Sequence, residues 1–273
     1  MLSYQHGFHA GNFADVHKHV IWGWILAYLK QKPKPITVMD VYAGAGKYDL
    51  RSESAQKTGE FHEGVERFIK KLKESAEASS SFEGYLSSLK KINPQWPELS
   101  AYPGSPALAY EALDGDDRLI LCELHPAEFT KLRKAFPQQG RRHQPAEATR
   151  VPVTFHQRDA LEALVALCPP KIRRGAVLID PSYEVKSEYA QVAAAVVKAY
   201  EKWPQGTYMI WYPILREGRH KKMVKQLQQL IESLVVHEFS PATPVRQGMQ
   251  GSGAVVINPP YLLEDQLTQL RPF

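Results

Sequence analysis

Two short segments of the chain end an apolar run with a polar residue, proline and tyrosine. The first, AVLIDPSYEVK, contains Asp180, Pro181 and Tyr183, and the second, AVVINPPYLLE, contains Asn258 and Tyr261. A carboxylate or amide oxygen beside a backbone carbonyl can accept both hydrogens of an exocyclic amino group and localise its lone pair for attack. Each segment therefore predicts a site that activates an amino group, with the tyrosine stacked on the acceptor ring.

Seven short β-rich runs must position these segments, and helical patterns separate most of them. Continuous apolar runs suit strands that are buried on both faces. The runs are 36–42, 118–125, 153–159, 176–181, 207–213, 234–239 and 254–260. Strands that alternate with helices predict an α/β fold with a mostly parallel, doubly wound sheet. The last two strands lack a helix between them, so we expect one antiparallel strand at that edge.

The interval 51–100 breaks the alternation of strands and helices. It contains charged helical sequence such as FHEGVERFIKKLKESAE and no convincing strand. Ser105 is a good helix N-cap, and the short helix that it starts leads directly into the second strand. We predict one Rossmann-like domain over residues 1–273, with residues 51–100 as a small helical insertion subdomain between the first strand and its crossover helix.

Glycine and acidic residues follow the first three strands. In an open parallel sheet, ligands bind beyond the carboxyl ends of the strands, where glycine lets the backbone approach a ligand and a carboxylate can bind ribose hydroxyls. The dinucleotide fingerprint lacks its third glycine here, so the pattern favours S-adenosylmethionine over NAD. The residues at these strand ends are Tyr42, Gly44, Gly46, Glu123, Asp159 and Ala160.

The place of each proline-tyrosine motif in the sheet separates the two candidates. Asp180 ends the fourth strand, beside the first strand in the middle of the sheet, whereas Asn258 ends the last strand, remote from the cofactor end. A proline-terminated edge strand explains the second motif. We therefore predict Asp180, Pro181 and Tyr183 as the catalytic residues. An acceptor base would have to be flipped out or single-stranded to reach them.

Composition and charge narrow the class of protein. Lys plus Arg exceed Asp plus Glu by 34 − 29 = 5, and the pI is about 9.0, a mild lean toward a polyanionic partner. The two cysteines suit reduced thiols, and no pattern supports a metal site beside the early histidines. The apolar run 20–29 is too short to span a bilayer, and the first residues lack a signal-peptide core. We expect a cytoplasmic monomer without a membrane segment, a metal or an obligate protein partner.

The chain resembles the RlmJ-type 23S ribosomal RNA adenine-N6 methyltransferases along essentially its whole length. The segments that carry the resemblance are MLSYQHGFHAGNFADVHKH, DVYAGAGKY, YPGSP, ELHP, LIDPSYE and INPP. The resemblance implies a class I, S-adenosylmethionine-dependent methyltransferase fold that acts on the N6 amino group of one adenine of 23S ribosomal RNA. It also implies Asp180 as the catalytic acceptor. The residues that it implies for cofactor contact are His19, Ser105, Glu123, Asp159, Ala160 and Asp180.

Two groups of residues are expected to contact the RNA. The resemblance implies that Tyr4 touches the RNA and favours His6 and Lys18 as further residues of the base pocket. Basic residues that follow the fifth strand are placed to bind phosphates on the side of the sheet that carries the site. These basic residues are Arg219, Lys221 and Lys222.

Two positions depart from the family pattern. The family usually has histidine where this chain has Tyr42, in the loop that would hold the methionine end of the cofactor, and proline where it has Ser182. A small residue keeps the shape of the motif but makes it less rigid, so we expect Ser182 to lower activity without abolishing it. Three other functions stay open: methylation of adenine N6 in DNA, methylation of a protein glutamine through an Asn-Pro-Pro-Tyr motif, and RNA binding by a catalytically decayed protein.

Overall fold

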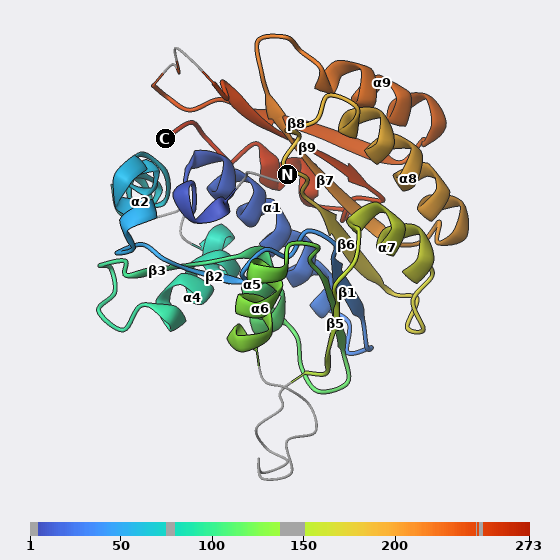
Figure 1. Cartoon of the computed structure of the whole chain (residues 1–273), viewed down its shortest axis with the longest axis horizontal. Helices are drawn as coiled ribbons and strands as arrows, with labels where there is room; N and C mark the ends of the chain where they lie inside the picture. The colour runs from blue at the N-terminus through green and yellow to red at the C-terminus, as the bar shows by residue number, and fades with distance from the viewer. Residues whose placement is uncertain (1–4, 75–79, 137–150, 244, 246–247) are drawn as a thin grey trace.

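Seven strands form one open sheet in the order β5-β4-β1-β6-β7-β9-β8 (Figure 1). The computed structural model of the chain describes residues 5–74, 80–136, 151–243, 245 and 248–273. The first five strands in that order run parallel, and β9 is antiparallel to both β7 and β8. The strands are β1 (Thr37–Asp40), β4 (Arg118–Cys122), β5 (Val153–His156), β6 (Gly175–Ile179), β7 (Thr207–Ile214), β8 (Leu234–Phe239) and β9 (Gly251–Ile257).

Each predicted β-rich run overlaps one of these strands, and the mostly parallel sheet is confirmed. The expectation of one antiparallel strand among the last two is confirmed by β9. The interpretation of the Asn258 motif as the end of an edge strand is wrong, because β9 lies between β7 and β8, and β8 forms the edge. Gly253 explains how β9 fits there, since a Cβ atom at this position would lie 2.1 Å from the Tyr212 ring of β7. The absence of a side chain lets the Tyr212 ring pack against β9.

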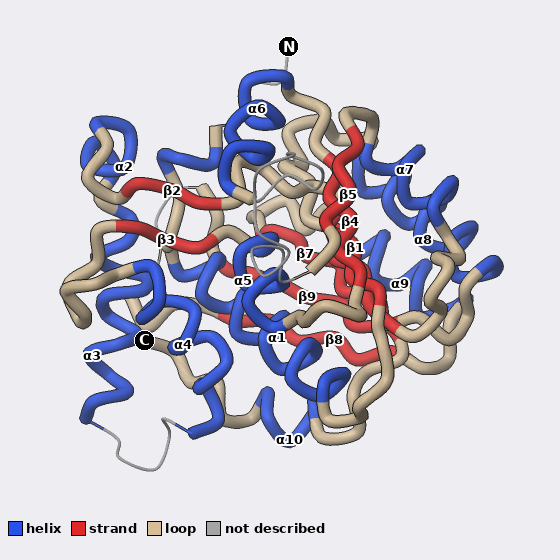
Figure 2. The backbone as a smooth tube through the Cα atoms, turned by 90° about the horizontal axis from the view of Figure 1, so that it is seen from below, coloured by secondary structure: helices blue, strands red, loops and turns tan. Residues whose placement is uncertain are grey.

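Helices cover both faces of the sheet. Figure 2 shows α7, α8 and α9 along one side of the strands, with α1, α5 and α6 on the other. No helix within the described ranges is both long and apolar enough to cross a membrane. The helices are α1 (Phe13–Lys30), α2 (Glu53–Thr58), α3 (Arg67–Glu74), α4 (Glu83–Ile92), α5 (Ser105–Ala112), α6 (Pro126–Ala135), α7 (Ala160–Leu167), α8 (Glu188–Lys202), α9 (His220–Leu230) and α10 (Leu263–Leu267).

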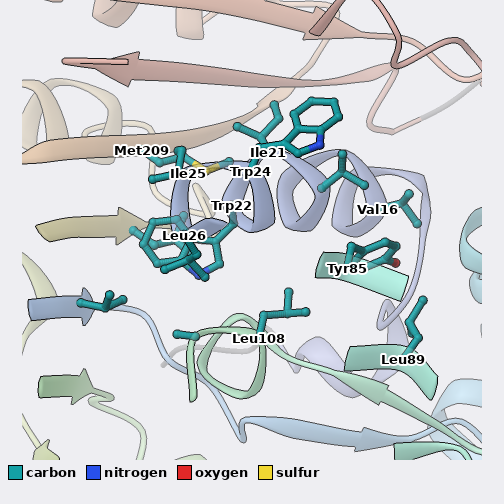
Figure 3. Packing of buried hydrophobic residues seen from close by; sticks show 14 of the residues in the cluster. Val16, Ile21, Trp22, Trp24, Ile25, Leu26, Tyr85, Leu89, Leu108 and Met209 are labelled. Carbon is teal, nitrogen blue, oxygen red and sulfur yellow. The ribbon is translucent and has the colours of Figure 1, made fainter. Parts of the chain in front are cut away.

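Helix α1 is buried along most of its length, which is why its sequence is apolar on nearly every side. Figure 3 shows it between Met209 of β7 on one side and Tyr85 of α4 and Leu108 of α5 on the other. Asn12 caps its first turn, because the Asn12 side-chain oxygen accepts a hydrogen bond of 2.9 Å from the Asp15 amide. The polar residues of its first two turns are therefore held at the carboxyl edge of the sheet.

Residues 51–100 contain α2, α3 and α4 and, among the residues described there, no strand. Strands β2 (Lys47–Asp49) and β3 (Ala101–Pro103) pair antiparallel and bracket this segment. The Ser105 cap is wrong, since Gly104 is the N-cap of α5 and Ser105 is its first helical residue. That residues 51–100 behave as a separate subdomain stays a prediction.

Candidate active site

A pocket of about 180 Å³ lies beyond the carboxyl ends of β1, β4, β5 and β6. We call it the cofactor-side pocket. It is lined by all the residues predicted to bind the cofactor except Gly46, and also by His6 and Lys18, which were predicted to face RNA. The lining residues that were predicted for the cofactor are His19, Tyr42, Gly44, Ser105, Glu123, Asp159, Ala160 and Asp180.

The loop after β1 is tied to the end of β4 by the Glu123 carboxylate. Its Oε2 accepts a hydrogen bond of 2.9 Å from the Gly44 amide, and its Oε1 accepts one of 2.7 Å from the His125 amide. Gly44 and Gly46 have φ angles of 58° and 78°, which glycine adopts without strain. A Cβ atom at Gly46 would lie 2.8 Å from the Phe136 ring. Gly46 therefore packs the loop against α6 and is not among the residues that line the pocket, and its contact with the cofactor stays a prediction.

Asp159 has a structural role that its sequence position did not reveal. It is the N-cap of α7, and its Oδ1 accepts hydrogen bonds of 3.0 Å from the amides of both Leu161 and Glu162. Such a cap satisfies amide groups that the helix itself leaves unpaired. The same side chain lines the cofactor-side pocket, so one oxygen fixes the helix while the residue faces the ligand space.

Asp40, at the end of β1, is a buried carboxyl behind this pocket. Its Oδ1 accepts a hydrogen bond of 3.2 Å from the Tyr42 amide, and its Oδ2 is buried without a partner among the described residues. Burial, together with the nearby Asp180 carboxylate, raises the pKa of Asp40 to about 7. The neutral acid is thus the form that the fold accommodates best.

We expect Asp40→Asn to stabilise the protein by about 2 to 4 kcal/mol at about pH 8 and to change it little at about pH 4. The folded protein keeps a proton on Asp40 up to a pKa of about 7, whereas the unfolded chain releases it near 3.8, so the wild type loses stability as the pH rises through that window. Asparagine copies the neutral acid. Urea unfolding at both pH values measures the effect, with the exposed Asp116→Asn as the control, and an effect independent of pH would contradict the expectation.

His19 presents an unsatisfied nitrogen at the cofactor-side pocket. Its Nδ1 lies 2.9 Å from the Tyr102 hydroxyl, while its Nε2 is buried and has no partner in the described part of the chain. Burial and the nearby Lys18 ammonium hold the pKa of His19 well below its usual range, so the ring is neutral. A buried polar atom without a partner calls for a polar group on a ligand. A polar cofactor such as S-adenosylmethionine fits this position.

A chain of polar side chains supports Asp180. The Lys18 ammonium lies 2.6 Å from Asp180 Oδ2 and 2.9 Å from Asp15 Oδ1, and His6 Nε2 lies 2.9 Å from Asp15 Oδ2. Burial lowers the pKa of Lys18, but the two carboxylates more than offset this and raise it overall. Burial likewise opposes ionisation of Asp15, yet His6 and Lys18 hold its pKa well below the usual range. Sequence reasoning missed Asp15 as a site residue, although its position three residues before Lys18 places both on one helix face.

A second cavity of about 640 Å³ lies on the other side of Asp180. We call it the acceptor-side cavity. It shares four lining residues with the cofactor-side pocket, namely His6, Lys18, Asp180 and Ser182. Within the described residues, Asp180 Oδ2 is bound by Lys18, while Oδ1 has no hydrogen-bond partner. The two spaces therefore meet at a carboxylate that has one oxygen available.

Tyr183 lines the acceptor-side cavity but does not present an open face to it. The ring is only 4% exposed, and Tyr189 stacks on it at a centroid distance of 4.2 Å. Its hydroxyl donates a hydrogen bond of 2.9 Å to the main-chain oxygen of Trp211. The expectation that Tyr183 stacks on the acceptor is wrong for this conformation, because a stacked base needs an exposed ring face. Tyr183 instead braces β7 behind the cavity.

The second motif lies at the opposite end of the sheet. Because β9 is antiparallel, Asn258 stands beside the start of β7, where its side-chain amide donates hydrogen bonds to the carbonyls of Pro204 and Gly206 at 2.7 and 2.8 Å. Asn258 lines neither the cofactor-side pocket nor the acceptor-side cavity. The placement predicted for this motif, away from the site, is confirmed.

The basic residues predicted to bind RNA phosphates lie at the start of α9. Arg219 is the N-cap of α9, Lys221 and Lys222 lie in its first turn, and none of the three lines the cofactor-side pocket or the acceptor-side cavity. Tyr4 lies outside the residues that the structure describes. Pro181 lines the acceptor-side cavity next to Asp180.

Comparisons with known proteins agree over nearly the whole chain. The family model described as "Ribosomal RNA large subunit methyltransferase D, RlmJ" matches residues 33–273. Two proteins named Ribosomal RNA large subunit methyltransferase J, from Escherichia coli K12 and Haemophilus influenzae, are each 38% identical over 275 residues, which cover 100% of this chain and 92% of each relative. A crystal structure of a Legionella pneumophila protein matches with a TM-score of 0.83 at 35% identity, over 96% of this chain and 91% of that one. The chain therefore belongs to the RlmJ family of large-subunit ribosomal RNA methyltransferases.

Proposed function

We propose that the protein methylates the N6 amino group of an adenine in 23S ribosomal RNA, with S-adenosylmethionine as the methyl donor. The observation that carries this proposal is the meeting of the two cavities at His6, Lys18, Asp180 and Ser182. A methyl donor in one cavity and an acceptor in the other would face each other across this wall. Membership of the RlmJ family supports both the donor and the RNA class.

The residues of the cofactor-side pocket would hold S-adenosylmethionine by distinct polar groups. His19 Nε2 suits a carboxylate of the ligand, the Glu123 carboxylate suits ribose hydroxyls, and Asp159 with Ala160 stands where an adenine edge would lie. The cofactor supplies an electrophilic methyl group on a sulfonium. Tyr42, which stands where the family usually has histidine, also lines this pocket and would contact the cofactor there.

Asp180 and Pro181 would prepare the adenine amino group for attack. That amino group is a poor nucleophile because its lone pair is delocalised into the ring. Asp180 Oδ1 and the Pro181 carbonyl would accept its two hydrogens and localise the lone pair, while Lys18 holds Oδ2 and fixes the carboxylate in one orientation. As the nitrogen–methyl bond forms, the bond between the methyl carbon and the sulfonium sulfur would break and leave a neutral thioether. Asp180 would then take the proton that the amino group releases.

The acceptor-side cavity would admit a base that has left the helix. A base inside a duplex cannot reach Asp180, so it must be flipped out or come from a single-stranded region. The cavity is larger than the cofactor-side pocket and carries polar side chains on its rim, among them His9, Asn12 and Glu60. His9 Nδ1 lies 2.8 Å from Glu60 Oε1, and the Asn12 amide donates a hydrogen bond of 3.0 Å to Glu60 Oε2. These groups would contact the edge of the base or its sugar.

Charge reversal at Lys221 and Lys222, both to Glu, is expected to weaken RNA binding and to lower the slope of log affinity against log salt by about 1.5. The reason is that each lysine that neutralises a phosphate releases counterions. Filter binding of 23S ribosomal RNA at several salt concentrations measures the slope. Reversal at Lys171 and Arg173, which are exposed before β6 at the other end of the sheet, is the matched control. Equal slopes for the two double variants would remove the first turn of α9 from the RNA surface.

Methyl transfer from labelled S-adenosylmethionine to an unmodified 23S ribosomal RNA transcript tests the proposed reaction. Nuclease digestion and nucleoside analysis should place the label in N6-methyladenosine. Parallel reactions contain DNA or a protein glutamine substrate. Label in either of these, with none in the RNA, would replace the proposal by the corresponding rival.

We further propose that the protein acts as a cytoplasmic monomer without an obligate protein partner. Light scattering of the purified protein, alone and with the transcript, measures the stoichiometry. A dimer at micromolar concentration would contradict the monomer.

A further inference from the structure

One wall of the acceptor-side cavity is apolar and comes from β7. Trp211, Pro213 and Leu215 line it, together with Met249 before β9, and Phe13 of α1 also lines the cavity. Trp211 is the only one of these with a ring system as wide as a purine, and it is half-buried at the cavity. A flat aromatic wall of this kind suits a flat ligand, because every base has a face that can stack.

The Trp211 indole is held by a relay of side chains, of which Ser252 and His17 are fully buried. Its Nε1 donates a hydrogen bond of 2.8 Å to Ser252 Oγ of β9. Ser252 Oγ lies 2.7 Å from His17 Nδ1 of α1, and His17 Nε2 lies 2.9 Å from His237 Nδ1 of β8. The contacts are satisfied when Ser252 donates to His17 and His17 donates to His237. Burial and His237 hold the pKa of His17 well below its usual range, so the relay is uncharged.

The Trp211 ring lies close to the catalytic carboxylate of Asp180, because Lys18 contacts both. Lys18 Nζ lies 5.7 Å from the centroid of the Trp211 ring and 2.6 Å from Asp180 Oδ2. Tyr183 fixes the main chain of Trp211 from behind through the hydrogen bond to its carbonyl oxygen. Tyr183 therefore holds the main chain of Trp211 and Ser252 holds its indole, beside the group that would accept the amino hydrogens.

We propose that the Trp211 indole is the surface on which the target base stacks, with Ser252, His17 and His237 as the positioning residues that hold it. This rests on the proposed function and deepens it. The tyrosine of the proline-tyrosine motif then acts as a support and the tryptophan as the stacking ring. Stacking places the base for attack but reads little of its identity, so the contribution lies in the methyl-transfer step more than in RNA affinity.

Single-turnover methyl transfer to the unmodified 23S transcript tests the stacking ring. Trp211→Ala should slow the step by about 10- to 100-fold, and Trp211→Phe, which keeps a smaller ring, by less than about 5-fold. RNA affinity should change by less than about 3-fold, because phosphate contacts dominate it. Affinity for S-adenosylmethionine should not change, since Trp211 does not line the cofactor-side pocket. Trp96→Phe is the control for loss of an indole elsewhere.

Fluorine NMR of protein labelled with 5-fluorotryptophan gives a readout that does not depend on activity. The chain has five tryptophans, so single replacements assign each signal. Addition of poly(A) should shift the Trp211 signal and leave that of Trp203, which is 0% exposed, in place. Ser252→Ala should broaden the Trp211 signal and slow methyl transfer, because the ring loses its anchor.

Three outcomes would either reject the stacking ring or separate its failure from failure of the proposed function. Trp211→Ala with the wild-type rate, while Asp180→Asn is inactive, would reject the stacking ring and leave the proposed function in place. A wild-type protein that fails to methylate the transcript would reject the proposed function, and the Trp211 shift with poly(A) would still decide the stacking ring. If Trp211→Ala fails to fold, the fluorine signal of the native protein decides, and an unshifted Trp211 signal rejects the proposal.

Discussion

Asp180→Asn is expected to slow methyl transfer by about 10²- to 10⁴-fold while cofactor affinity stays within about 3-fold of the wild type. The amide keeps an oxygen toward the acceptor-side cavity but loses the negative charge that stabilises the developing positive charge on the amino group. It also cannot take the released proton. Single-turnover transfer to the 23S transcript measures the rate, and calorimetric titration with S-adenosylmethionine measures the affinity.

Asn258→Gly is the matched control for Asp180→Asn. Glycine accepts the φ angle of 49° at this position, but it loses the hydrogen bonds of the side-chain amide to Pro204 and Gly206. We expect a loss of about 1 to 3 kcal/mol in unfolding free energy and an unchanged rate per folded molecule. An inactive Asn258→Gly together with an active Asp180→Asn would refute the choice of motif.

Lys18→Met is expected to lower the free energy of unfolding by about 3 to 5 kcal/mol and to abolish most activity. The Lys18 side chain is 5% exposed, and its ammonium is shared by Asp15 and Asp180, which are 2% and 15% exposed. Methionine keeps much of the aliphatic stem but leaves two carboxylates close together without their cation. Urea unfolding measures the loss of stability, and single-turnover transfer measures the loss of function.

A second replacement separates the stability effect of Lys18 from its effect on activity. Asp15→Asn added to Lys18→Met removes one of the two uncompensated charges, so part of the lost stability should return, while activity stays low because Asp180 is still unsupported. Lys131→Met, at an exposed ion pair with Glu128, should stay within about 0.5 kcal/mol of the wild type. Equal losses for Lys18→Met and Lys131→Met would contradict the buried network.

The strands and the edge that carries the site could be predicted from the sequence because both depend on local patterns. Continuous apolar runs identify strands that are covered on both faces, and a parallel sheet brings the ends of these strands to one edge. Glu123, Asp159 and Asp180 could therefore be assigned to the cofactor-side pocket by their positions alone. The position of β9 between β7 and β8 could not be predicted in this way, because no local sequence pattern records the order of strands at the edge of a sheet.

Two kinds of feature could not be predicted from the sequence: the direction in which a side chain points, and contacts between residues that are far apart in the chain. Tyr183 has a φ angle of 53°, and in this backbone geometry its ring packs with Tyr189 in the core, away from the acceptor. Lys18 and Asp180 are 162 residues apart, so their pairing depends on how α1 crosses the sheet. The role of Gly46 could not be predicted for the same reason. A glycine after a strand can allow the close approach of a ligand or, as at Gly46, of a neighbouring helix.

Helix α1 precedes every strand of the sheet, yet the polar partners of His17 and Lys18 come late in the chain. His17 meets Ser252, which is 235 residues further on. Contacts between such distant residues form slowly, because closing a long loop costs entropy before any contact forms. Helices α4 and α5 can cover one side of α1 early, but until β9 has been synthesised a nascent chain leaves the side that packs on β9 uncovered, and during that time this apolar surface is exposed to aggregation and to chaperones. Catalytic competence comes only with the last part of translation, so a product truncated before β9 would be inactive.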